Sequence, residues 1–75
     1  MTPERRAELK MSYDVTCVAL TDATKRVQLR GEILLSGEAL PADVVEYNNE
    51  KRRMKRLVAK KATLAGLISM IERNA

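Results

Sequence analysis

The chain has 75 residues, enough for a single domain of residues 1–75 and close to the lower limit for a self-sufficient core. It contains no Phe and no Trp, so the core has to be built from aliphatic side chains, Met and two Tyr. It has no His and one Cys, Cys17, which excludes an internal disulfide and a usual zinc site. Because one core rarely supplies more than about 3–5 kcal/mol at this size, we expect self-association or a partner protein.

The charge is unevenly distributed along the chain. The overall charge is +4. Residues 1–50 contain nine acidic and six basic residues, a net charge of −3, whereas residues 51–75 contain eight basic residues and one acidic residue, a net charge of +7. This asymmetry predicts either an anionic partner for the C-terminal segment or charge pairing between the two halves.

A first helix is predicted over residues 3–20. Thr2 is a suitable N-cap, and Pro3 suits the first helical position, where the missing N–H has no cost. The apolar residues that recur at helical spacing are Leu9, Tyr13, Cys17 and Leu20.

A second helix is predicted over residues 22–35. Thr21 or Asp22 can cap it, because short polar side chains accept hydrogen bonds from the first N–H groups of a helix. The apolar spacing continues in phase as far as residue 34, so one bent helix over residues 3–35 is the alternative. Ser36-Gly37 predicts the end, with Gly37 in the left-handed conformation.

The last helix is predicted over residues 41–73. Pro41 and Asp43 suit its first turn, and no proline follows them, although Asn48-Asn49 is a weak point. At 1.5 Å per residue this helix is about 50 Å long. That is too long for a compact bundle of three helices, so we expect part of it to project or to pair with another chain.

This last helix carries an apolar row at the alternating three- and four-residue spacing of a coiled-coil seam. The members of the apolar row are Met54, Leu57, Leu64, Ile68 and Ile71, with Lys61 at the remaining position. The row predicts a seam for self-association or partner binding, or equally the core side of a bundle within the chain. Leu64 and Ile68 are expected to be central, because charge is sparsest around them.

The opposite side of the same helix is rich in bases. We name it the basic face, and it comprises Lys51, Arg52, Arg53, Lys55, Arg56 and Lys60. A helix with one basic and one apolar side can bind nucleic-acid phosphates, an anionic membrane or an acidic protein, and it can also be merely solvated. Sequence-specific base reading is disfavoured, because residues 51–61 contain no Asn or Gln and two Tyr cannot form a stacking platform.

No catalytic residue, cofactor-binding residue or metal ligand is predicted. The absence of His removes the commonest general base near neutral pH, and no nucleophile motif or phosphate-binding glycine loop is present. Asp43, Glu46 and Glu50 share a helix face, and pairing with downstream bases explains them better than a metal site. No apolar stretch approaches the roughly 20 residues of a membrane span, and no signal peptide is visible, so we expect a cytoplasmic location.

These patterns predict an all-α protein of two or three helices, arranged as a helical hairpin or small bundle with a long, basic, amphipathic C-terminal helix. The expected function is that of a non-catalytic interaction protein (a small regulator, adaptor or inhibitor). It would bind another protein or itself, as a homo-oligomer, through helix faces. The alternative is a nucleic-acid-binding protein that contacts the phosphate backbone through the basic face.

Overall fold

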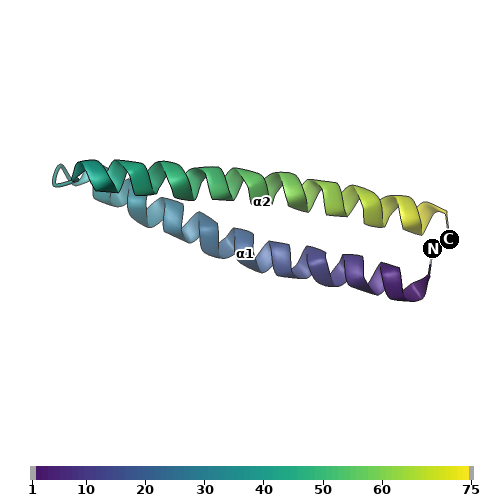
Figure 1. The fold of residues 1–75 in the computed structure, drawn as a ribbon. Coiled ribbons are helices and arrows are strands. Elements are labelled where there is room, and N and C mark those ends of the chain that lie inside the picture. The colour runs from purple at the N-terminus through teal and green to yellow at the C-terminus, as the bar shows by residue number, and fades with distance from the viewer. Residues whose placement is uncertain (1, 75) are drawn as a thin grey trace.

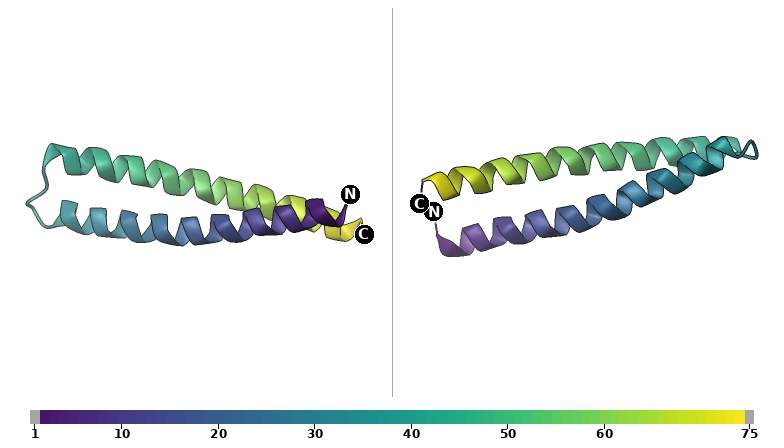
Figure 2. Two further views of the ribbon diagram at one scale, coloured as in Figure 1. Left: turned by 60° about the horizontal axis from the view of Figure 1, so that its bottom comes forward. Right: turned by 180° about the vertical axis from the view of Figure 1, so that it is seen from behind.

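The chain folds into a hairpin of two long helices. The computed structural model describes residues 2–74 and contains helix α1 (Pro3–Leu35) and helix α2 (Pro41–Arg73), each of 33 residues. The helices run antiparallel, so the two ends of the chain lie together at one end and the connecting loop lies at the other (Figures 1 and 2). The molecule measures 55 × 14 × 14 Å. The predicted all-α fold is confirmed, in its hairpin form.

The ends of α1 follow from local hydrogen bonding. The Thr2 hydroxyl accepts a hydrogen bond from the N–H of Arg5 at 3.3 Å, and Pro3 occupies the first turn. At the other end, Gly37 has a φ of 81°, a left-handed conformation that a residue with a Cβ rarely adopts. The predicted N-cap and the predicted glycine stop are both confirmed.

The predicted boundary between helices 3–20 and 22–35 is wrong, because α1 continues without a break through this region. The Thr21 hydroxyl donates to the carbonyl of Cys17 at 3.0 Å, one turn earlier in the same helix. Asp22 forms an ion pair with Arg26 at 3.1 Å, one turn later. Both polar side chains are thus engaged along the helix and do not cap a new one. The single-helix alternative describes the chain correctly.

Helix α2 matches its predicted range. The Asp43 carboxylate accepts a hydrogen bond from the N–H of Leu40 at 2.8 Å, which closes the first turn. The helix continues through Asn48-Asn49 and ends at Arg73. The expectation that part of this helix projects is wrong, because α1 has the same length and runs beside it, and pairing with another chain stays a prediction.

The two helices meet along one seam. Its residues are buried or half-buried, and they recur at alternating intervals of four and three residues, as in a coiled coil. The seam runs from Leu9 to Leu34 on α1 and from Asp43 to Ile71 on α2. Within residues 2–74, the buried side chains are Leu9, Thr16, Ala23 and Leu64. A seam between only two helices therefore gives a thin core.

Candidate interaction surfaces

The basic face lies on the solvent side of α2. All six of its residues are exposed, and Lys61, the neighbouring base, is half-buried at a seam position. The ammonium of Lys61 lies 6.0 Å from the centre of the Tyr13 ring on α1, at the limit of a cation–π contact. The structure thus separates a seam lysine from six outward bases, as the helical spacing predicts.

Ion pairs join the two helices, but within residues 2–74 none of them joins an acid of residues 1–50 to a base of residues 51–75. The acidic partners come from α2 and the basic partners from α1. The pairs are Arg6 and Lys10 with Glu72 at 3.4 and 3.5 Å, Arg30 with Glu46 at 2.7 Å, and Arg26 with Glu50 at 3.9 Å. The excess bases of α2 take no part in this pairing.

The basic face therefore keeps its charge. Within residues 2–74, none of its six residues forms an ion pair with an acidic side chain. Three of them, Arg52, Lys55 and Arg56, line an open groove of about 490 Å³ together with Asn49. Lys51 lies 5.7 Å from the centre of the Tyr47 ring. Uncompensated bases around a shallow groove form a surface suited to an anionic partner.

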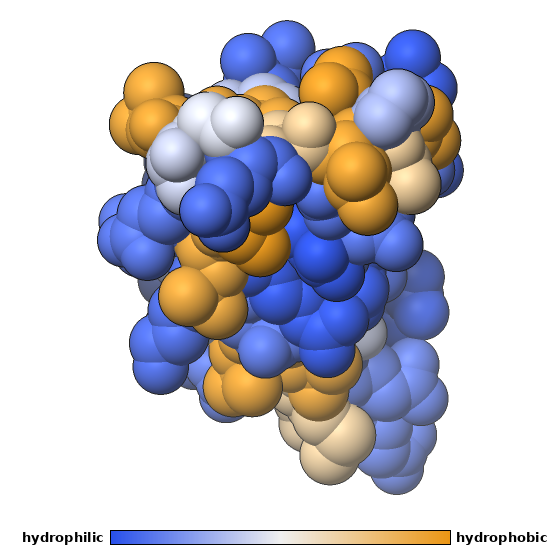
Figure 3. Space-filling model, turned by 90° about the vertical axis from the view of Figure 1, so that its left-hand side faces the viewer, coloured by the Kyte–Doolittle hydropathy of each residue, from blue (hydrophilic) through white to orange (hydrophobic). Residues whose placement is uncertain are grey.

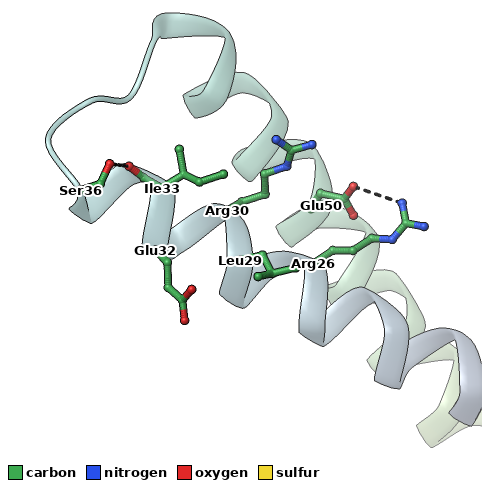
Figure 4. Close-up of a pocket in the computed structure, with 7 residues that line it drawn as sticks. All are labelled: Arg26, Leu29, Arg30, Glu32, Ile33, Ser36 and Glu50. Carbon is green, nitrogen blue, oxygen red and sulfur yellow. Dashed lines mark hydrogen bonds and ion pairs between the residues drawn. The ribbon is translucent and has the colours of Figure 1, made fainter.

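A second groove lies near the loop end, where the last turns of α1 pass Glu50 of α2 (Figure 4). It measures about 530 Å³, and its lining includes Arg26, Leu29, Arg30, Ile33 and Glu50. Figure 4 shows Glu50 on the side of α2 toward which the two arginines extend. Because these arginines already pair with acids of α2, the positive charges of this groove are compensated within the chain.

Glu50 is unusual among these groups, because it occupies a seam position. Its side chain is 20 % exposed. Its Oε1 lies 3.9 Å from a guanidinium nitrogen of Arg26, while its Oε2 is buried and accepts no hydrogen bond from any residue in the range 2–74. A half-satisfied carboxylate in a seam costs stability relative to an apolar side chain.

The apolar row on α2 faces α1. Leu64 is buried, and Met54, Leu57, Ile68 and Ile71 are half-buried. Since α1 is the only other helix among the described residues, it supplies this burial. The apolar row thus forms the core side of α2 within the chain. This was one of the two alternatives that its spacing left open, the other being a seam with a second chain. Its role in contact with a second chain stays a prediction.

The sequence-based reasoning missed an apolar surface on the outside of α1. We name it the outer row, and it comprises Met11, Val15 and Val18, which are 69 %, 63 % and 71 % exposed. The signal was present, because these residues follow one another at spacings of four and three. It was overlooked because the stripe from Leu9 to Leu20 had already accounted for the helix. Hydrophobic side chains also reach the surface in several separate places at the loop end (Figure 3).

The three acidic residues Asp43, Glu46 and Glu50 do not act together. One caps α2, and the other two pair with different arginines of α1, where the sequence favoured pairing with downstream bases of the same helix. Among residues 2–74, no group of three potential ligands is placed to hold a metal ion. Neither helix, over the part of the chain described, has an apolar stretch long enough to cross a bilayer.

Comparisons with protein families, with curated proteins and with solved structures find no match to this chain.

Proposed function

We propose that this chain is a non-catalytic interaction protein that binds other macromolecules through its helix faces and self-associates. The observation that supports the proposal is the imbalance between core and surface. Three hydrophobic residues of the described chain are buried, whereas twelve large hydrophobic residues are exposed. Single exposed hydrophobic residues are normal on a protein surface, but an excess of this size over the core indicates an interaction surface.

The accessible area leads to the same inference. A compact protein of 8.4 kDa exposes about 4,600 Å². This chain exposes 5746 Å², an excess of about 1,100 Å² over the compact value. Its radius of gyration is 16.8 Å, compared with about 11 Å for a compact chain of this length. The hairpin therefore leaves area uncovered that a second molecule can bury.

The proposal assigns no catalytic step to the chain. The sequence contains no His, and Cys17 is a half-buried residue of α1. The proposed setting is the cytoplasm, a reducing compartment in which a single cysteine stays in its thiol form.

The concentration dependence of thermal unfolding tests the proposal. If assembly supplies part of the stability, raising the protein concentration about 100-fold should raise the midpoint temperature by about 5–10 °C, because mass action favours the assembled state. Circular dichroism measures the midpoint, and light scattering measures the mass at the same concentrations. A midpoint that does not change across the series, together with a constant monomer mass, would contradict self-association.

A second candidate function is binding to the phosphate backbone of a nucleic acid. The observation in its favour is that the six residues of the basic face form no ion pair within residues 2–74, although bases of α1 do pair with acids. Backbone binding needs this kind of uncompensated, exposed charge, and it needs no base-reading side chains.

Salt-dependent binding to a generic DNA duplex tests this second candidate. Five or six phosphate contacts predict a log–log slope of affinity against salt of roughly −4 to −5. Lys55→Gln with Arg56→Gln should reduce the slope by about two. The matched control is Arg5→Gln with Arg6→Gln, which removes two charges that already face acidic side chains. No binding at low salt, or equal effects of both double variants, would dismiss this candidate.

A further inference from the structure

Helix α1 presents apolar residues on two sides. One side forms the seam with α2 and includes the buried residues Leu9 and Ala23. The other side carries the outer row, Met11, Val15 and Val18, which is more than 60 % exposed at each position. A helix at the surface of a monomer is normally polar on the side away from its core. The outer row is therefore a face that α2 leaves unpartnered.

The outer row belongs to a second set of positions with coiled-coil spacing. This set begins at Glu8, continues through the three residues of the outer row, and ends at Asp22 and Lys25. Its successive members are separated by three, four, three, four and three residues. The middle of this set is apolar, and its ends are charged. Asp22, next to Lys25 at the C-terminal end, already pairs with Arg26 of the same helix at 3.1 Å. Glu8 lies at the N-terminal end and Lys25 lies at the C-terminal end, and both are exposed.

We propose that a second copy of this chain packs its α1 antiparallel against this set. This inference rests on the self-association in the proposed function and names its surface. In coiled-coil register, Val15 of one copy lies opposite Val18 of the other, Met11 lies opposite Asp22, and Glu8 lies opposite Lys25. The two-fold axis then passes between Val15 and Val18 on the outer side of α1, and each contact occurs twice.

Charge selects a second copy in this orientation. A parallel arrangement would place Glu8 against Glu8 and Lys25 against Lys25, and like charges directly opposite one another repel. The antiparallel arrangement places the carboxylate of one copy against the ammonium of the other. Lys25 forms no ion pair within residues 2–74, and Glu8 contacts only Arg5, at 3.3 Å, in an exposed pair. Both groups are thus accessible to the second copy.

The excess accessible area of the hairpin is comparable with the area that a dimer interface buries. The excess of about 1,100 Å² per chain over a compact protein of the same mass amounts to about 2,200 Å² for two copies. Stable interfaces bury about 1,200–2,000 Å² in total, and obligate homodimers bury more. Two hairpins joined through the outer rows would add a second apolar seam, between the two α1 helices, to the seam that each hairpin already has with its own α2.

Light scattering on purified variants of the full chain tests the proposal. The parent is expected to have twice the monomer mass of 8.4 kDa. Val15→Glu with Val18→Glu should raise the dissociation constant at least about 100-fold, because four buried valines become carboxylates. The matched control is Leu35→Glu with Val45→Glu, which changes two valine- or leucine-sized residues that are 89 % and 58 % exposed near the loop. This control should remain dimeric.

A charge swap tests the orientation without touching the apolar residues. Glu8→Lys alone and Lys25→Glu alone should each weaken the dimer about threefold to tenfold, and the double variant should restore it. A dimer that survives the two valine substitutions as well as the control overturns the proposed surface and leaves self-association standing. A parent that is monomeric at about 100 µM overturns both. Failure of the double swap to restore binding overturns the antiparallel arrangement. If the valine variant loses helicity, the charge swap decides alone.

Discussion

Replacing Leu64 with Ala is expected to lower the free energy of unfolding by about 2–3 kcal/mol. Leu64 is 8 % exposed, so nearly all of the roughly 1.5–3 kcal/mol for burying a leucine is realised at this position. Truncation of a packed leucine costs about 2–5 kcal/mol in total. We expect the lower half of that range, because a seam between two helices can partly close over the missing atoms. Against a total stability of about 5 kcal/mol, this loss is large.

The assay is urea unfolding followed by circular dichroism, with Val58→Ala as the control. Val58 lies on the same helix but is 50 % exposed, so its truncation should change the free energy by no more than about 0.5 kcal/mol. The unfolding midpoint should fall for Leu64→Ala with an unchanged slope. Adding Ile68→Ala, a half-buried neighbour in the apolar row, should abolish cooperative unfolding. Equal midpoints for the Leu64 and Val58 variants would refute the placement of the seam.

Three further substitutions test other parts of the structure. Gly37→Ala should destabilise the hairpin by about 1 kcal/mol, because Gly37 has a positive φ. Gly66→Ala should stabilise the hairpin by about the same amount, because Gly66 lies in a helix with open space around it. Thermal melts of the two variants will show whether their effects have opposite signs. Glu50→Leu should raise the free energy of unfolding by about 1 kcal/mol, and an unchanged or lower urea midpoint would show that the carboxylate is satisfied. Lys55→Gln with Arg56→Gln should leave the free energy of unfolding within about 0.5 kcal/mol of the parent, since both side chains are exposed and unpaired within residues 2–74, and a larger loss in urea unfolding would reveal a structural role.

The parts of the fold that the sequence predicted depend on short-range chemistry. The N-cap at Thr2, the proline at the start of each helix and the left-handed Gly37 are each specified by one or two residues, and each is confirmed. The spacing of the apolar row also placed Lys61 at a seam position, where the structure has it half-buried.

The parts of the fold that the sequence did not predict depend on competing local hydrogen bonds or on the position of the second helix. Thr21 and Asp22 can cap a helix or bond along one, and only the continuation of packing against α2 decides between these states. The ion pairs between the helices depend on the relative register of the two helices, which the composition of the chain does not determine. For this reason the net charges of the two halves did not predict these pairs. Glu46 and Glu50 belong to the acidic half but lie on α2, and they pair with Arg30 and Arg26 of α1.

The basic face and the outer row illustrate the same limit for function. Helical spacing placed the bases outward, but their lack of acidic partners within residues 2–74 emerges only when α1 lies beside α2. The spacing of the outer row is visible in the sequence, but its exposure depends on which side of α1 the second helix covers.

The most direct test of the central claim, that this hairpin acts by associating through its helix faces, is sedimentation equilibrium of the intact chain from about 1 to 100 µM. Self-association predicts a mass that rises from near 8.4 kDa toward twice that value as concentration increases. A mass of 8.4 kDa at every concentration, from a chain that remains fully helical, would contradict it.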